Sequence, residues 1–332
     1  MRILLTPNLP RSVRTLAEEL LPPGCSLDIM AASHPGYDDA LAAAECIMGL
    51  PRARFDDALI ARAPRLVLIQ LLRTGHELVD LAATERARIQ VATVGDTTSE
   101  AVAEHCLMLM LALCRKLRWQ HTAVVDGGWL AAKPWQLPNG DVDSVPEVQF
   151  DGLAGRTLGL LGVGQIGSRV AQLASAFGMM VRGMGSRVGD HTRDGVPLVP
   201  FVPLLETSDV VSLHLRLSDE TRHIMDAQAF AHMRRGAFLI NTARGELVDE
   251  AALVDALARG QLAGAALDTL QQEPPAPDHP LLGRPDVLLT PHTAWLTRDS
   301  WRRTLAFGFA NVERFQAGQP LRSRVRPRPM DP

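Results

Sequence analysis

The chain has 332 residues, of which 46% are hydrophobic and 21% charged, and its formal net charge at pH 7 is −3. This composition is typical of a globular protein large enough for two domains, and it excludes the basic excess of a nucleic-acid-binding protein. The longest apolar run, at 107–113, is shorter than the roughly 20 residues that a membrane span requires. The N-terminal residues show no signal-peptide cleavage pattern, so we expect a protein of the cytoplasm.

The four cysteines are spread along the chain without the CxxC spacing of a metal site or redox motif. Cys25, Cys46, Cys106 and Cys114 therefore predict neither a zinc site nor a disulfide framework. We expect buried thiols in a reducing compartment and no bound metal.

Short apolar runs alternate with helical patterns over the first hundred residues. Strands are expected at 3–5, 27–30, 46–48, 66–71 and 91–94, and a helix reaching residue 21 has Ser12 as a candidate cap. A longer apolar helix is expected at 99–117, buried on most sides, followed by a Gly-, Pro- and Trp-rich arm at 126–148. The alternation predicts a parallel sheet flanked by helices.

A glycine motif, Gly162-Val-Gly164-Gln165-Ile166-Gly167, begins near the middle of the chain. The motif alone is weak, because 26 of the 332 residues are glycine and an ordinary glycine-rich turn would look the same. However, a strand-like run at 157–161 precedes it, an amphipathic helical pattern follows to residue 177, and another strand-like run follows at 180–184. Strand, turn, helix and strand in this order predict a dinucleotide whose pyrophosphate lies at the helix N-terminus.

The acidic residue that would hold the ribose 2′-hydroxyl of NAD is missing. About 20 residues after the motif, where that acid is expected, the chain reads Gly185-Ser186-Arg187. A hydroxyl and a guanidinium suit a 2′-phosphate, so the sequence predicts a preference for NADP(H), with NAD(H) possible. The alternative is that Arg187 is a solvated loop charge.

Further strand-like runs at 209–215, 237–241, 264–270 and 287–290 continue the same alternation. A final helix is expected at 298–317, packed on the first domain, and the Arg- and Pro-rich tail from Arg322 is expected to be disordered.

Three of the runs after the glycine motif are followed by side chains suited to proton and hydride chemistry. Arg244, Glu273 and His292 come after different strands, and the carboxyl ends of parallel strands share one edge of a sheet. Arginine binds a carboxylate in a planar, two-pronged way, and histidine exchanges protons near neutral pH. Glu273 would orient the imidazole and stabilise its protonated form. A structural histidine and a surface arginine are the alternatives for each residue taken alone.

With these motifs the chain resembles the D-isomer-specific 2-hydroxyacid dehydrogenases, a family that includes glyoxylate and hydroxypyruvate reductases and glycerate dehydrogenases. The resemblance runs from the interdomain helix, with Ala101-Val-Ala-Glu104-His105, to Pro291-His292, and so covers nearly the whole chain. It implies an α/β fold with two doubly wound parallel-sheet domains. A Rossmann cofactor domain, residues 99–295, would be inserted into a flavodoxin-like substrate domain formed by residues 1–98 and 296–332.

The resemblance also implies roles for particular residues. Arg244, Glu273 and His292 would be the catalytic set, and Asp268 would bind the nicotinamide amide. The cofactor would further contact Gly162, Gly164, Gln165, Ile166, Gly167, Ser186, Arg187, His214, Thr242 and Ala243. The substrate carboxylate would rest on the loop Arg73-Thr74-Gly75. A homodimer is usual in the family, and Trp135 either reaches the partner's site or packs within its own arm.

The first domain departs from the family pattern, with Gly75-His76-Glu77 where Gly-x-Asp is frequent. The identity of the substrate is therefore open, as are the roles of His76 and Arg73. We expect an NADP(H)-preferring reductase of a small 2-oxo acid such as glyoxylate or hydroxypyruvate, with no nucleic-acid or membrane partner. Two alternatives are an NAD-linked dehydrogenase working oxidatively and a non-catalytic dinucleotide-sensing binding protein.

Overall fold

The computed structural model describes residues 1–6, 9–49, 54–127, 150–185 and 192–326. The chain forms two compact units. The terminal unit consists of Met1–Thr98 and Leu296–Pro332, and the inserted unit consists of Ser99–Trp295.

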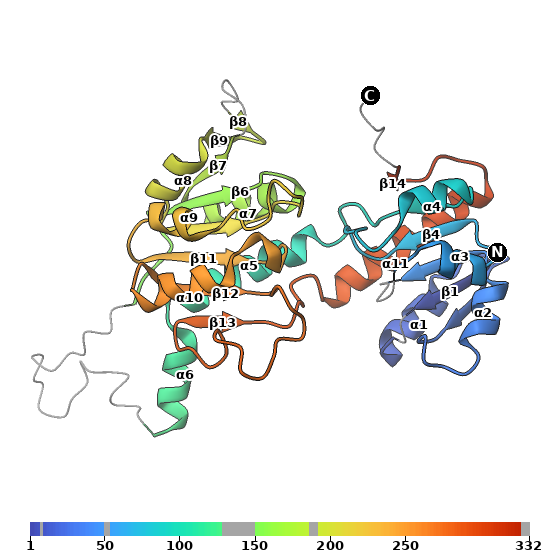
Figure 1. The fold of residues 1–332 in the computed structure, drawn as a ribbon, viewed down its shortest axis with the longest axis horizontal. Coiled ribbons are helices and arrows are strands. Elements are labelled where there is room, and N and C mark those ends of the chain that lie inside the picture. Colours follow the sequence, from blue (N-terminus) through green and yellow to red (C-terminus); the bar gives the residue numbers. More distant parts are fainter. Residues whose placement is uncertain (7–8, 50–53, 128–149, 186–191, 327–332) are drawn as a thin grey trace, which may run out of the picture. The chain divides into compact units, whose positions relative to one another are not determined.

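The terminal unit is built on a six-stranded sheet (Figure 1). Its strands are β1 (Arg2–Thr6), β2 (Ser26–Ile29), β3 (Cys46–Gly49), β4 (Leu68–Leu71), β5 (Gln90–Ala92) and β14 (Arg324–Val325). They lie in the order β14-β5-β4-β3-β1-β2, and all pair in parallel except β14, which is antiparallel to β5. The order β2-β1-β3-β4-β5 is the flavodoxin-like one, as predicted.

Five helices belong to this unit: α1 (Arg11–Glu19), α2 (Tyr37–Ala43), α3 (Asp57–Arg62), α4 (Leu81–Arg86) and α11 (Arg298–Gln316). Helix α2 buries Tyr37 and Leu41 in the same cluster as Ile47 and Ile69 of the sheet. Helix α11 packs near β4, so that a Cβ on Gly308 would come within 3.3 Å of Leu72. The prediction that the final helix packs on the first domain is therefore confirmed.

Two local predictions for this unit were wrong. Helix α1 begins at Arg11 after Pro10, whose φ of −54° already suits a helix start, so Ser12 lies inside the helix and is not its cap. Residues 322–326 of the tail are ordered, because β14 pairs with β5 and the backbone N–H of Arg322 donates to Asn311 Oδ1 at 3.0 Å, and the rest of the tail lies outside the described residues. The tail's composition carries no signal for this pairing.

The inserted unit is built on an eight-stranded sheet (Figure 1). Its strands are β6 (Thr157–Leu161), β7 (Met180–Met184), β8 (Thr192–Arg193), β9 (Val196–Val199), β10 (Val210–Leu213), β11 (Ala237–Asn241), β12 (Leu262–Leu267) and β13 (Val287–Leu289). The order is β13-β12-β11-β10-β6-β7-β9-β8, with all pairs parallel except the β8–β9 hairpin. This is the doubly wound order that the glycine motif predicts, so the fold class is confirmed.

Helices cover both faces of this sheet because its strands alternate apolar side chains between the faces. Helices α5 (Ser99–Cys114) and α7 (Gln165–Ala176) share one core with Leu158 and Ile240. Helices α8 (Phe201–Thr207), α9 (Ala227–His232) and α10 (Glu250–Ala258) share the other with Leu161 and Leu239. Because β6, β10, β11, β12 and β13 are parallel, the loops that follow them all leave the sheet at its carboxyl edge.

The predicted helix at 99–117 is interrupted. Helix α5 ends at Cys114, Lys116 adopts a left-handed φ of +48°, and a separate helix α6 (Leu117–Val125) follows. Cys46, Cys106 and Cys114 are buried free thiols as predicted, whereas the free thiol Cys25 is partly exposed, contrary to the prediction.

Candidate active site

The glycine turn between β6 and α7 is shaped by close backbone contacts. Gly162 has φ +104°, and a Cβ there would lie 2.8 Å from the carbonyl carbon of His214. A Cβ on Gly167 would lie 2.1 Å from Gly162 O, whereas a Cβ on Gly164 would meet no atom within 4 Å. Gly162 and Gly167 are thus required for packing, and Gly164 faces open space at the start of α7.

This open space fits a dinucleotide. Gly164 is the N-cap residue of α7 and makes no side-chain cap, and Gln165 and Ile166 are the first helical residues. Their backbone N–H groups lack helical acceptors and favour an anion such as a pyrophosphate. The predicted cofactor residues of this turn lie where such a group would rest.

His214 follows β10 and lies beneath the same turn. Its Nε2 is 2.9 Å from Ser212 Oγ. Desolvation lowers the pKa of His214 to about 4. The ring is therefore neutral at pH 7 and adds no charge to the proposed phosphate site.

The turn after β11 carries Arg244 and is held by a buried asparagine. Asn241 Oδ1 accepts from Ala243 N at 3.0 Å, and its Nδ2 donates to Arg244 O at 2.8 Å. Thr242 is buried, with its Oγ1 3.1 Å from Cys106 Sγ, and Arg244 Nη1 donates to Ala243 O at 2.7 Å. Asn241 fixes the backbone on both sides of Ala243, a role that sequence reasoning missed.

Asp268, after β12, fastens the loop that carries His292. Its buried carboxylate accepts from Thr290 Oγ1 at 2.6 Å, from Thr293 N at 2.9 Å and from Ala294 N at 2.9 Å. Its backbone carbonyl accepts from His292 N at 2.8 Å. His105 of α5 joins this network, with Nε2 3.0 Å from Thr290 Oγ1. The structure thus gives Asp268 a fastening role that the sequence did not indicate.

Glu273 and His292 form a hydrogen-bonded pair at the carboxyl edge of the sheet. His292 Nδ1 lies 2.8 Å from Glu273 Oε2, and the two side chains are 43% and 38% exposed. An ionised carboxylate only accepts hydrogen bonds, so Nδ1 carries the hydrogen and Nε2 is left to face a substrate. His292 adopts φ +56°, an uncommon conformation that the surrounding loop imposes on it.

The positive charge of Arg244 contributes to the low pKa of Glu273. Desolvation alone would raise the pKa of Glu273, but the hydrogen bond and charge of His292, the backbone N–H of Leu270 and the charge of Arg244 together lower it. Glu273 is therefore ionised at neutral pH. The structure brings together all three residues of the predicted catalytic set.

The remaining predicted residues belong to the terminal unit or lie outside the described residues. Arg73, Thr74 and Gly75 follow β4 in the terminal unit, where Arg73 Nη2 lies 3.8 Å from Glu77 Oε2. Ser186, Arg187 and Trp135 lie outside the described residues. Within the described ranges, no group of three His, Cys, Asp or Glu side chains is placed to hold a metal ion. Of the helices described, none combines the length and apolarity needed to cross a membrane.

A dinucleotide turn with an Arg, Glu and His set on one edge of a doubly wound sheet defines the class of nicotinamide-dependent oxidoreductases. Comparison with known proteins makes this more specific. Residues 107–294 match the model of the D-isomer specific 2-hydroxyacid dehydrogenase NAD binding domain. The chain is 35% identical over 291 residues to a glyoxylate reductase of Aeropyrum pernix, covering 86% of this chain and 84% of that one.

Two further comparisons indicate the same family. A glycerate dehydrogenase of Methylorubrum extorquens is 35% identical over 263 residues, 79% of each chain. The crystal structure of the TT0316 protein from Thermus thermophilus superposes with a TM-score of 0.84 at 33% identity, covering 98% of this chain and 100% of that one. The chain belongs to the D-isomer-specific 2-hydroxyacid dehydrogenase family, and it is an NAD(P)-dependent enzyme of that family.

Proposed function

We propose that this enzyme reduces a small 2-oxo acid of the glyoxylate or hydroxypyruvate type to the D-2-hydroxy acid, with a preference for NADP(H). The observation that carries the reaction is the Glu273–His292 hydrogen bond of 2.8 Å, with Arg244 close enough to lower the pKa of Glu273. The glyoxylate reductase and glycerate dehydrogenase among its relatives support this substrate class. In this proposal the inserted unit holds the cofactor and the terminal unit supplies the substrate loop at Arg73-Thr74-Gly75.

Each of the proposed catalytic residues has a separate role in the reduction. The nicotinamide, when bound, supplies a hydride to the carbonyl carbon. Arg244 binds the carboxylate and polarises the carbonyl with a planar, two-pronged guanidinium. His292 Nε2 gives its proton to the carbonyl oxygen, so the carbonyl becomes a hydroxyl and the imidazole becomes neutral. Ionised Glu273 holds the ring at Nδ1 and favours its protonated form before the transfer.

The bound dinucleotide would rest on Gly162, Gly164, Gln165, Ile166 and Gly167, with His214, Thr242 and Ala243 along the neighbouring strand ends. Asp268 would meet the nicotinamide amide while keeping the His292 loop in place. The open space at Gly164 supports this placement.

The preference for NADP(H) rests on the residues that follow β7. Gly185 offers no carboxylate to repel a 2′-phosphate, and Ser186 and Arg187 come next. A carboxylate at position 185 would also need room, since a Cβ there would lie 3.1 Å from Leu198 Cβ.

Initial rates with NADPH and NADH, measured on a panel of 2-oxo acids, test the substrate class and the cofactor preference together. We expect kcat/KM to be higher with NADPH by about tenfold or more, since a guanidinium–phosphate pair contributes roughly 1.5–3 kcal/mol. Arg187→Ala should remove most of that difference.

Arg193→Ala is the matched control, because Arg193 is an exposed arginine of the neighbouring β8. It should leave the cofactor ratio unchanged. Equal efficiency with both cofactors, or an unchanged ratio in Arg187→Ala, would instead mean that Arg187 is a solvated loop charge. The absence of turnover with every acid of the panel would contradict the proposed substrate class.

We infer that the enzyme forms a homodimer through the surface of α5 and α6. Met108, Leu117, Trp119 and Val125 of these helices are 47%, 57%, 39% and 68% exposed. Helix α6 buries none of its residues within the described chain. Exposed apolar side chains on two neighbouring helices are typical of a site of association. Sedimentation equilibrium should give twice the chain mass, and a monomer at micromolar concentration would contradict this inference.

A further inference from the structure

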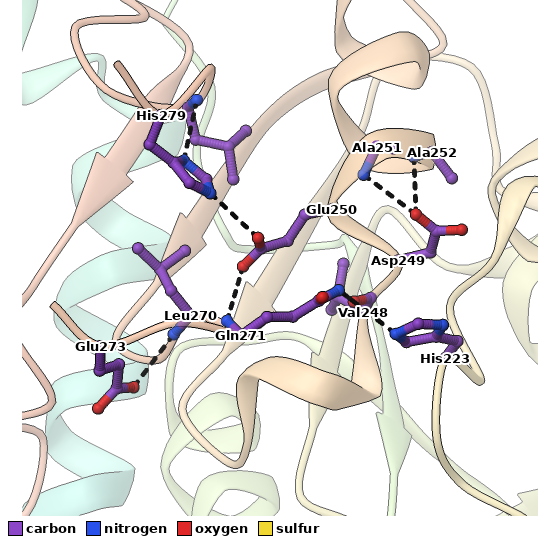
Figure 2. Close-up of polar contacts among 11 residues, drawn as sticks. His223, Val248, Asp249, Glu250, Ala251, Ala252, Leu270, Gln271, Glu273 and His279 are labelled. Carbon is purple, nitrogen blue, oxygen red and sulfur yellow. Dashed lines mark hydrogen bonds and ion pairs between the residues drawn. The ribbon is translucent and has the colours of Figure 1, made fainter. Parts of the chain in front are cut away.

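Glu250 is largely buried and lies outside the proposed catalytic set. It is the first residue of α10, and its side chain is 15% exposed. Its Oε2 lies 3.0 Å from Nε2 of His279, a side chain 14% exposed, and its Oε1 accepts from the backbone N–H of Gln271 at 2.8 Å (Figure 2). One carboxylate thus joins the start of α10 to two points of the loop between β12 and β13.

The hydrogens in this network can be assigned from its partners. The backbone N–H of Leu281 donates to His279 Nδ1 at 3.3 Å, so Nδ1 acts as an acceptor and Nε2–H donates to Glu250. Gln271 N–H is also a donor. Glu250 therefore faces two donors, and both of its oxygens must accept.

The peptide between Leu270 and Gln271 is held from several sides. Its N–H, that of Gln271, goes to Glu250, and the Gln271 side chain donates to Val248 O at 2.7 Å (Figure 2). On another side it contacts the turn of Arg244, since a Cβ on Gly245 would lie 2.0 Å from Leu270 C. This peptide therefore adjoins the Arg244 turn.

The same segment positions Glu273. The backbone N–H of Leu270 donates to Glu273 Oε1 at 3.1 Å, and the other oxygen, Oε2, pairs with His292 Nδ1 at 2.8 Å. Figure 2 shows the two hydrogen bonds, from Gln271 N–H to Glu250 and from Leu270 N–H to Glu273, which the peptide bond between Leu270 and Gln271 connects. A displacement of Gln271 N would move Leu270 and with it the carboxylate that orients His292.

We propose that Glu250 is a positioning residue: by holding the Leu270–Gln271 peptide, it fixes Glu273 and, through Glu273, the imidazole of His292. This inference rests on the proposed roles of Glu273 and His292. Glu250 itself contacts neither substrate nor cofactor in this role.

The test is Glu250→Gln, which keeps the size of the side chain and replaces one acceptor by a donor. If the amide oxygen keeps Gln271 N–H, the NH₂ group faces His279 Nε2, which can accept only in the tautomer that gives up the hydrogen bond from Leu281 N–H. We expect kcat for 2-oxo acid reduction to fall about tenfold, as for other residues that orient a catalytic side chain, with KM for NADPH within about twofold of the wild type. Amide exchange of residues 268–273, followed by mass spectrometry without substrate, should become faster.

The pH profile of kcat gives a third measurement. Leu270 N–H is one of the groups that lower the pKa of Glu273, together with His292 and Arg244. Loss of this hydrogen bond should raise the pKa of Glu273, so the acid limb of kcat should move to higher pH. A residue that only stabilised the fold would not shift this limb.

Asp249→Asn is the matched control. Asp249 lies next to Glu250 and caps the same helix, with Oδ1 accepting from Ala251 N at 3.0 Å and from Ala252 N at 3.1 Å (Figure 2). The change removes the same charge from the same helix end, and Asn still caps. It should leave kcat, the pH profile and the exchange of 268–273 as in the wild type.

The outcomes separate this inference from the proposed function. If both variants lower kcat alike, or if Glu250→Gln changes neither kcat nor exchange, Glu250 is not a positioning residue. If the wild type reduces no 2-oxo acid while Glu250→Gln still accelerates exchange at 268–273, the proposed function fails and the restraint on the Leu270–Gln271 peptide stands.

Discussion

His292→Asn should lower kcat by about 10²–10⁴, the range for loss of a general acid, while the Kd for NADPH stays near that of the wild type. Asparagine suits this test because His292 has φ +56°, a conformation that Asn adopts more readily than most residues. Its amide would remain near the position of Nδ1, beside Glu273, but it has no group at the position of Nε2. The loss would therefore report the proton transfer and not a distorted loop. Stopped-flow oxidation of NADPH measures kcat, and fluorescence titration measures Kd.

His232→Asn is the control for this variant. His232 lies in the last turn of α9, with Nδ1 3.4 Å from Glu206 Oε1, and so is also a histidine beside a carboxylate. It should keep full activity. A His292→Asn enzyme with nearly normal kcat would show that another group supplies the proton.

Arg244→Lys should lower kcat/KM for the 2-oxo acid by roughly 10²–10³, although the positive charge is retained. Lysine cannot make two parallel hydrogen bonds to a carboxylate, and each such bond to a charged group contributes about 1.5–3 kcal/mol. We expect most of the decrease in kcat/KM to appear as a higher KM for the acid, because the carboxylate is bound in the ground state as well as in the transition state.

The control for this second variant is Arg235→Lys, at an exposed arginine just before β11. It should leave kcat/KM unchanged. If Arg244→Lys raised KM for NADPH instead of KM for the acid, Arg244 would belong to the cofactor site and the carboxylate would be bound elsewhere.

The sheets, and the position of the proposed catalytic trio at one edge of a sheet, could be predicted from sequence because they depend on local patterns. Each of Arg244, Glu273 and His292 follows an apolar run, and parallel strands carry such positions to one edge. The glycine motif could likewise be interpreted from its neighbours in the chain. These features need no knowledge of which side chains meet across the fold.

The network behind the trio could not be predicted in this way. Glu250 lies at the start of α10, Gln271 and His279 lie in the loop between β12 and β13, and no period relates their positions. The fastening role of Asp268 depends on Thr290, Thr293 and Ala294, which become neighbours only when β12 and β13 pair. Helix α6 was missed because the left-handed residue that precedes it is Lys116, a residue type with no turn signal.

In the part of the chain that the structure describes, residues 250–294 of the inserted unit supply hydrogen bonds that hold Glu273, His292 and their loops. The residues proposed to transfer the proton are thus held by hydrogen bonds made within the inserted unit. On the proposed roles, mutation of the substrate loop at Arg73-Thr74-Gly75 would alter the acid accepted and leave the hydrogen bonds of Glu273 and His292 unchanged. Directed evolution of a new substrate range should accordingly begin with randomised residues 73–77 and leave 241–294 intact.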